Sequence, residues 1–143
     1  MLGLFSLSPT AVSGLTEFVR WSNLLAGIDR EPTAAELGAH QGMIAVHTLR
    51  VENFLMFLKH VQNGATLRAE SQLVESPRFT MRGKLDWMIT ASRDELWPPD
   101  RLCHSLQQLR PFTDGNGRII RALRLRSEVR HGAKAYGGAF AVY

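Results

Sequence analysis

The sequence predicts one mainly α-helical domain with a small β-hairpin. Its 143 residues suit a single hydrophobic core, and 45% of them are apolar, which is typical of a globular domain. Apolar residues recur at helical spacing over much of the first 62 residues and again just before residue 110. Between residues 79 and 90 the composition is instead typical of two short strands joined by a turn.

The first helix is expected from about Pro9 to Ala26. Ser8 is a favourable N-cap residue, and proline is well tolerated in the first turn of a helix. Gly27 is suited to ending the helix, because glycine readily adopts the left-handed conformation found at helix C-termini. The apolar residues at roughly helical spacing are Leu15, Phe18, Val19, Leu24 and Leu25.

A second, longer helix is expected from Thr33 to about Gln62. Thr33 and Glu36 have the spacing of a capping box, and Asn63 and Gly64 are suited to closing the helix. The supporting apolar residues are Met43, Val46, Leu49, Phe54, Phe57, Leu58 and Val61. Three histidines lie along this stretch without a partner at i+4 that would complete a metal pair, so we interpret them as surface or core residues: His40, His47 and His60.

The β-hairpin is expected at residues 79–90. Phe79–Arg82 and Leu85–Thr90 have the composition of strands, and Gly83-Lys84 separates them as a turn would. The turn Trp97–Asp100 then begins a helix that leads to a glycine-rich segment. Its apolar positions are Leu102, Leu106 and Leu109.

The segment from Arg110 to Arg121 reads Arg-Pro-Phe-Thr-Asp-Gly-Asn-Gly-Arg-Ile-Ile-Arg. Gly115 and Gly117 can adopt positive φ and turn successive backbone amides to one side. A helix is expected to follow over Ile119–Leu125. A glycine-rich turn before a helix N-terminus is an anion site, because the unpaired amides and the helix dipole both favour negative charge.

Three side chains of this segment add to the predicted anion site. Arg118 and Arg121 are three residues apart, so they share a helix face and present planar guanidinium groups that bind phosphate. Asp114 is placed to hold a hard cation such as Mg²⁺ against the same phosphates.

This segment resembles the signature of the Fic (Fido) family, His-Pro-Phe-x-Asp-Gly-Asn-Gly-Arg-x-x-Arg. Every fixed position from Pro111 to Arg121 agrees with it. The resemblance implies a Fic-type helical bundle with a β-hairpin flap, and the transfer of AMP from ATP to protein hydroxyl groups. It implies Mg²⁺ at Asp114, and nucleotide binding by Gly115, Asn116, Gly117, Arg118 and Arg121.

Arg110 stands where the family has its catalytic histidine, which takes the proton from the target hydroxyl. An arginine stays protonated at ordinary pH and cannot act as a general base. His104, on the preceding helix, lies away from that face and is not expected to replace the histidine. The sequence therefore predicts an impaired AMP transferase. The alternatives are a non-catalytic nucleotide-binding or interaction module and a degenerate family member.

Two further segments resemble parts of the family. Ser22–Gly27 is similar to the inhibitory helix Ser-x-x-x-Glu-Gly, with Ala26 at the position of the glutamate that pairs with the second motif arginine. The resemblance implies no self-inhibition of this type, and it allows a small antitoxin-like inhibitor as a partner. Phe79–Ile89 resembles the flap that binds a protein target by strand pairing.

The resemblance ends near residue 125, so we assign a single Fic-like domain to residues 1–125 and an atypical basic, glycine-rich tail to residues 126–143. The basic end comprises Arg118, Arg121, Arg124, Arg126, Arg130 and Lys134, against one acid, Glu128. A solvated helix face explains it more simply than nucleic-acid binding, for which interleaved aromatic residues are lacking.

The chain is expected to be cytoplasmic. Cys103 is the single cysteine, so no internal disulfide can form and a reducing compartment is the simpler assumption. The apolar start of the chain is too short for a membrane span and lacks the basic residues of a signal peptide.

Overall fold

The computed structural model describes residues 9–69, 80–94 and 96–131, and these form six α-helices. In chain order they are α1 (Pro9–Leu25), α2 (Ala34–Ala45), α3 (Val51–Val61), α4 (Met81–Arg93), α5 (Pro99–Leu109) and α6 (Asn116–His131). The described residues contain no strand, only an isolated antiparallel bridge between Leu67 and Phe112. The prediction of a mainly α-helical fold is confirmed.

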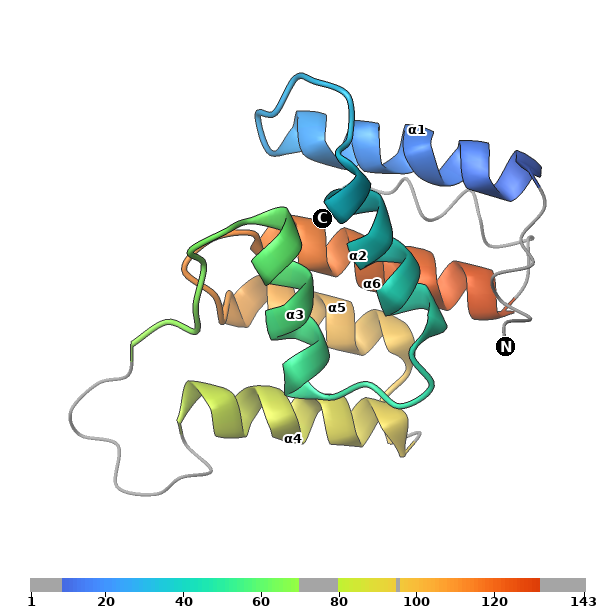
Figure 1. The fold of residues 1–143 in the computed structure, drawn as a ribbon. Coiled ribbons are helices and arrows are strands. Elements are labelled where there is room, and N and C mark those ends of the chain that lie inside the picture. Colours follow the sequence, from blue (N-terminus) through green and yellow to red (C-terminus); the bar gives the residue numbers. More distant parts are fainter. Residues whose placement is uncertain (1–8, 70–79, 95, 132–143) are drawn as a thin grey trace.

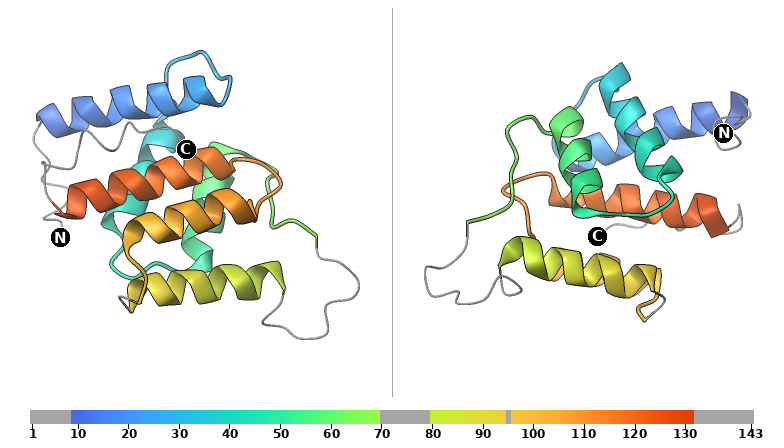
Figure 2. Two further views of the ribbon diagram at one scale, coloured as in Figure 1. Left: turned by 180° about the vertical axis from the view of Figure 1, so that it is seen from behind. Right: turned by 60° about the horizontal axis from the view of Figure 1, so that its bottom comes forward.

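Helix α6 lies at the centre of the fold. Seen from behind, α1, α6, α5 and α4 lie side by side in one layer (Figure 2, left). Helices α2 and α3 cross the other side of this layer and pack against α6 (Figure 1). Because α6 has neighbours on both sides, even polar residues in it are buried, including Arg118, Arg121 and Glu128.

Two hydrophobic clusters fill the interior. The larger joins Met43 of α2 to residues of the next four helices, including Phe54, Leu85, Leu106 and Ile119. The smaller lies between α1, α2 and α6 and consists of Leu15, Phe18, Val19, Ile44 and Leu125.

The first helix agrees with its prediction. α1 ends at Leu25, and Gly27 follows with a φ of 82°. The chain closes on the helix end through a hydrogen bond of 2.9 Å from Ile28 N to Asn23 O. The glycine therefore serves the expected purpose of ending the helix.

The prediction of one long helix from Thr33 to Gln62 is wrong, because residues 46–50 separate α2 from α3. No glycine or proline lies in this connection, so the local sequence gives no signal for the break. Instead, Arg126 of α6 donates to Val46 O at 2.9 Å, where the backbone leaves the helix with φ −61° and ψ 130°. The break is a consequence of tertiary contacts.

The prediction of a β-hairpin at residues 79–90 is also wrong. Residues 81–93 form α4, and Phe79 lies outside the described residues. Gly83, expected in the turn, donates its backbone N–H to Thr80 Oγ1 at 3.0 Å and so belongs to the capped first turn of the helix. A target peptide cannot pair with a strand here, because the backbone amides bond within the helix. The buried residues have helical spacing: Met81, Leu85, Met88, Ile89 and Ala91.

The last described helix is longer than the one predicted over Ile119–Leu125. α6 continues through His131, so residue 126 lies inside a helix, and residues 132–143 lie outside the described part of the chain. No helix among the described residues is long and apolar enough to cross a membrane.

The described arginines of the basic end bind groups within the protein. Arg124 forms ion pairs with Asp100 and with Glu128, the latter at 2.9 Å. Arg126 and Arg130 donate to carbonyl groups at the end of α2. Lys134 lies outside the described residues.

Substituting Leu85 should destabilise the domain far more than substituting Trp87. Leu85 is 0% exposed and Trp87 is 60% exposed, whereas a strand would have placed both side chains on one face. We expect Leu85→Ala to lower the free energy of unfolding by about 2–5 kcal/mol. Trp87→Ala should cost about 1 kcal/mol, because its ring contacts Trp97 with centroids 5.2 Å apart. Urea denaturation measures both values, and equal losses would contradict the helix.

Candidate functional site

The predicted site lies at the turn between α5 and α6. Arg110 follows the last residue of α5 with φ 46° and ψ 65°, in the left-handed region. Its backbone N–H donates to Leu106 O at 2.8 Å, which closes the end of the helix. Among the described residues it is the only one other than glycine with positive φ, and its side chain is exposed.

Asn116 holds the turn together. Its side-chain oxygen accepts from Phe112 N at 3.0 Å, and its side-chain nitrogen donates to Phe112 O at 2.8 Å. Both residues are buried, so these groups satisfy one another away from water. The amide side chain therefore has a structural partner, and what Asn116 can offer a nucleotide is its backbone N–H.

Arg68, which the sequence analysis did not single out, fixes the turn from the other side. Its backbone N–H donates to Pro111 O at 2.8 Å. Its guanidinium donates to Leu109 O at 2.6 Å and also to Arg110 O. These partners are 41 and 42 residues away in the chain, and no local pattern in the sequence indicates such a contact.

The two glycines of the turn have different roles. Gly115 has a φ of +81°, and a Cβ atom on it would lie 2.6 Å from Leu58 Cδ2, so the position requires glycine. Gly117 does not have the expected positive φ, because it belongs to the first turn of α6. A Cβ atom there would lie 3.0 Å from Arg121 Nη1. Its missing side chain leaves room for that guanidinium at the start of the helix.

The first backbone amides of α6 are free of hydrogen bonds within the helix. The first hydrogen bond of the helix runs from Ile119 N to Gly115 O at 3.1 Å. The amides of residues 116–118 precede this bond and have no acceptor within the helix. They lie at the positive end of the helix dipole.

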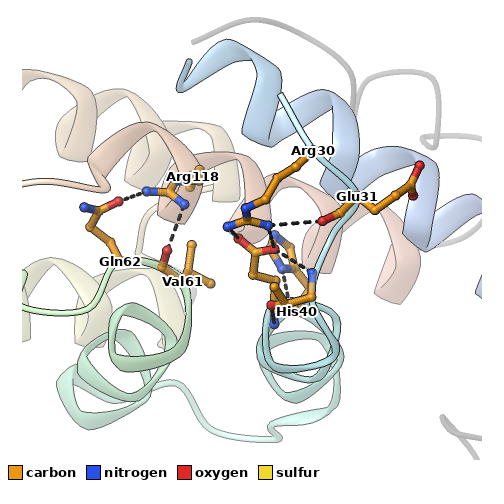
Figure 3. A network of polar contacts seen from close by, with 8 residues as sticks. Arg30, Glu31, His40, Val61, Gln62 and Arg118 are labelled. Atoms are coloured by element: carbon orange, nitrogen blue, oxygen red, sulfur yellow. Dashed lines mark hydrogen bonds and ion pairs between the residues drawn. The ribbon is translucent and has the colours of Figure 1, made fainter. Parts of the chain in front are cut away.

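Arg118 reaches from α6 to the end of α3 (Figure 3). Its Nη1 donates to Val61 O at 2.9 Å, and its Nη2 donates to Gln62 Oε1. The residue is 2% exposed, and its Nε has no partner among the described residues. Burial lowers the pKa of Arg118, an effect that Glu36 and Asp114 partly offset.

Arg121 binds the end of α1. Its Nε donates to Ser22 Oγ at 2.7 Å, and its Nη2 donates to Ser22 O at 2.9 Å. Burial lowers the pKa of Arg121 to about 10, and the nearby charge of Arg118 acts in the same direction. Among the described residues, no ion pair joins either motif arginine to a carboxylate.

An ion pair between an exposed arginine and a buried glutamate lies near Arg118. Arg30 donates to the two carboxylate oxygens of Glu36 at 2.9 and 3.1 Å, and the charge of Arg30 acts to lower the pKa of Arg118. Burial acts to raise the pKa of Glu36, but hydrogen bonds from Arg30 and Thr33 outweigh it and lower the pKa to about 2. Because Glu36 is already paired with Arg30, it only partly compensates the charge of Arg118.

His40 packs beneath this ion pair as a neutral core residue. Its Nδ1 lies 2.7 Å from Glu36 O, and because a carbonyl can only accept, Nδ1 carries the proton. Burial lowers the pKa of His40 to about 4. The rings of Phe18 and Phe57 contact it edge-on.

Asp114 and Arg110 face solvent at the turn. Asp114 Oδ1 accepts from Gly115 N at 2.7 Å, and no ion pair forms between Asp114 and Arg110. The described residues contain no group of three His, Cys, Asp or Glu side chains that could hold a metal ion. A cation at Asp114 would therefore take its other ligands from phosphate oxygens and water, which is usual for Mg²⁺.

The structure places all the predicted site residues on one turn and the first turns of α6, but it directs them to different sides. Arg118 and Arg121 are buried, whereas Arg110 and Asp114 are exposed. Ser22 was noted only as part of an inhibitory-type segment, and Gln62 was not singled out. Both lie far from the motif in sequence, so their contacts with the arginines had no local signal.

Comparison of the chain with protein-family models, with curated proteins and with solved structures found no match.

Replacing Gly115 should destabilise the domain, whereas replacing Gly42 should not. Gly115→Ala forces a positive φ on alanine and places its Cβ against Leu58, so we expect a loss of about 1–3 kcal/mol in the free energy of unfolding. Gly42 lies within α2 with nothing near its Cβ position. Gly42→Ala should therefore stabilise the domain by about 0.5–1 kcal/mol. Chemical denaturation compares the two, and similar effects would contradict the turn geometry.

Proposed function

We propose that this chain is a Fic-type domain that binds the phosphates of ATP at the start of α6 and transfers AMP to protein hydroxyls weakly or not at all. One arrangement carries the proposal. Gly115, at positive φ, leads directly into the helix N-terminus, and Arg118 and Arg121 lie in the first turns behind it. The nucleotide itself is inferred from the resemblance of Pro111–Arg121 to the Fic signature.

The balance of charge favours an anion at this place. Glu36 is paired with Arg30 and also acts on Arg118, whereas the charge that acts on Arg121 is the positive charge of Arg118. Burial lowers the pKa of both motif arginines, which means that their surroundings disfavour the positive charge. A polyphosphate at the start of α6 would offset that penalty.

The motif arginines still have donors for a phosphate. Arg121 Nη1 lies against the backbone of Gly117 and makes no hydrogen bond within the described chain. Arg118 Nε is also without a partner among the described residues. The present acceptors, Val61 O, Gln62 and Ser22, are uncharged. An anionic phosphate would form the stronger, charge-assisted hydrogen bonds.

Asp114 fits Mg²⁺ as one ligand among phosphate and water oxygens. When bound, the cation would neutralise charge on the nucleotide phosphates. The carboxylate is exposed and has one oxygen occupied by Gly115 N, so it is accessible from solvent.

Arg110 is the reason that we propose weak transfer. Its guanidinium cannot accept a proton from an attacking hydroxyl group. The backbone at this position is held by Leu106 and Arg68, through contacts that do not involve the side chain of Arg110. A different side chain at residue 110 would therefore extend from the same backbone position in the turn.

The end of α1 supports the likeness to an inhibitory segment. Ser22 contacts Arg121, and Ala26 follows Ser22 by about one helical turn. A methyl group offers no negative charge to Arg121, so we propose no self-inhibition from this position. A small inhibitor protein that brings a carboxylate to Arg121 is the proposed partner.

The alternatives differ from this proposal in AMP transfer or in nucleotide binding. A non-catalytic interaction module would bind nucleotide and transfer nothing even with its base restored, whereas a degenerate family member would bind no nucleotide. Measurements of ATP binding and of AMP transfer separate the three.

Calorimetric titration with ATP and Mg²⁺ should show binding that depends on Arg121. We expect Arg121→Gln to weaken it by about tenfold or more, because a hydrogen bond from a charged group contributes about 1.5–3 kcal/mol. Arg82→Gln is the matched control, since Arg82 pairs with Glu52 on an exposed surface. Binding that survives Arg121→Gln unchanged would place the nucleotide elsewhere. No heat with the folded wild-type chain would favour the degenerate member.

Arg110→His should raise AMP transfer. A general base contributes about 10²–10⁴-fold to a rate, so we expect a gain of that order in the label transferred from α-labelled ATP to protein. Histidine is among the residues that tolerate positive φ best, so the change should preserve the turn. Circular dichroism checks the fold of the variant. Equal labelling by the wild-type chain would refute the role assigned to Arg110, and an inactive but ATP-binding variant would favour the interaction module.

A further inference from the structure

A cavity of about 920 Å³ lies where the α2–α3 connection meets α4, α5 and α6. Its lining residues from α6 belong to the second half of that helix, whereas the turn that follows α5 leads into its start. Its volume is within the range of about 300–1,000 Å³ that is typical of small-molecule sites. Nothing in the proposed function uses it.

The walls of this cavity are strongly basic. Arg93 comes from the end of α4, and Arg126 and Arg130 come from the last turns of α6. None of the described residues that line it is acidic, so the three guanidinium charges are not balanced within it. Hydroxyl groups of Thr48 and Ser127 add further hydrogen-bonding groups.

The floor of the cavity is apolar. Ile89, Leu102 and Leu123 belong to the buried core and line it together with the half-buried ring of Trp97. A ligand that fills this space therefore meets a hydrophobic surface on one side and positive charge on another, a combination that is typical of sites for small organic molecules.

Backbone carbonyls orient the three guanidinium groups. Arg126 Nη2 donates to Val46 O at 2.9 Å, and Arg130 Nη1 donates to Ile44 O at 3.2 Å. Arg93 Nη1 donates to Leu49 O at 3.2 Å. These acceptors hold the side chains in place without cancelling their charge.

Each arginine keeps further donors for a ligand. A guanidinium has five N–H bonds, and the carbonyl contacts use only part of them. Arg126 Nε is buried and has no partner among the described residues. Burial, together with the charge of Arg130 four residues later in α6, lowers the pKa of Arg126 to about 10. An added negative charge would relieve both effects.

We propose that this cavity binds a small organic anion. Its negative group would lie between Arg126 and Arg130, with Arg93 as a third contact, and its apolar body would pack on Leu102 and Trp97. This inference does not depend on the proposed function. The competing explanation is that the arginines only cap the C-terminal carbonyls of α2, which is favourable in itself.

The test uses two fluorescent probes of similar shape on the full chain. 8-Anilinonaphthalene-1-sulfonate carries a negative charge, and N-phenyl-1-naphthylamine is its uncharged counterpart. We expect the sulfonate to bind at one site, about tenfold or more tightly than the amine, to weaken as salt is added, and to be displaced by inorganic pyrophosphate. Equal affinity for the two probes would overturn the proposal.

Substitutions then locate the site. Arg126→Met keeps an unbranched stem of similar length and should reduce sulfonate binding by about tenfold or more, leaving binding of the amine unchanged, whereas Arg126→Lys should restore part of the loss. Arg93→Met provides an independent change at an exposed residue if Arg126→Met proves unstable. Arg82→Gln is the control and should leave sulfonate binding unchanged. Sulfonate binding that is the same in a folded Arg126→Met or Arg93→Met variant as in the wild type would show that these arginines serve only as caps.

Discussion

The fold depends on the hydrogen bonds that arginines of the central helix α6 donate to carbonyl groups of other helices. Arg118 donates to Val61 O at the end of α3, Arg121 donates to Ser22 O in the last turn of α1, and Arg126 donates to Val46 O just after α2. The last carbonyl groups of a helix have no partner within it and carry partial negative charge. Guanidinium groups of α6 therefore supply donors to carbonyl groups at the ends of three helices. Arg68 does the same for α5.

This arrangement leaves positive charge uncompensated at both ends of α6. A carbonyl group accepts a hydrogen bond but does not cancel a charge, and burial then lowers the pKa of Arg121 and of Arg126 to about 10. At the start of α6 the helix dipole adds to the positive potential, whereas at its end the dipole opposes it. The second region therefore depends more on side chains, among them Arg93 of α4. Each of the two proposed anion sites lies at one of these regions of positive charge.

The motif turn combines rigidity with exposure. The side chain of buried Asn116 forms hydrogen bonds with the backbone N–H and C=O of Phe112. The guanidinium of exposed Arg68 donates to the carbonyl groups of Leu109 and Arg110. The exposed side chain of Arg110 therefore projects from a fixed backbone. Because these contacts use backbone groups of Arg110, its side chain can be replaced without loss of the contacts that hold the turn.

The sequence by itself determined the features that arise from near neighbours in the chain. The end of α1 at Gly27, the capping box at Thr33 and Glu36, and the positive φ of Gly115 all depend on residues within about one turn of each other. The helical spacing of the buried residues in α3 was also predicted from the sequence. Each of these features is set by residues that are close together in the chain.

Only the tertiary structure decided the rest. Residues 46–50 leave the helix without a glycine or proline, where arginines of α6 bind the carbonyls around them. Residues 81–93 form a helix although Gly83 costs about 1 kcal/mol there, because the Thr80 cap and several buried side chains outweigh it. From the sequence the arginines of α6 were predicted as phosphate ligands or as a solvated face, and no local pattern indicated their acceptors within the protein, which lie up to 99 residues away. Contacts between residues so far apart in the sequence are set by tertiary packing. Local sequence patterns carry no information about that packing.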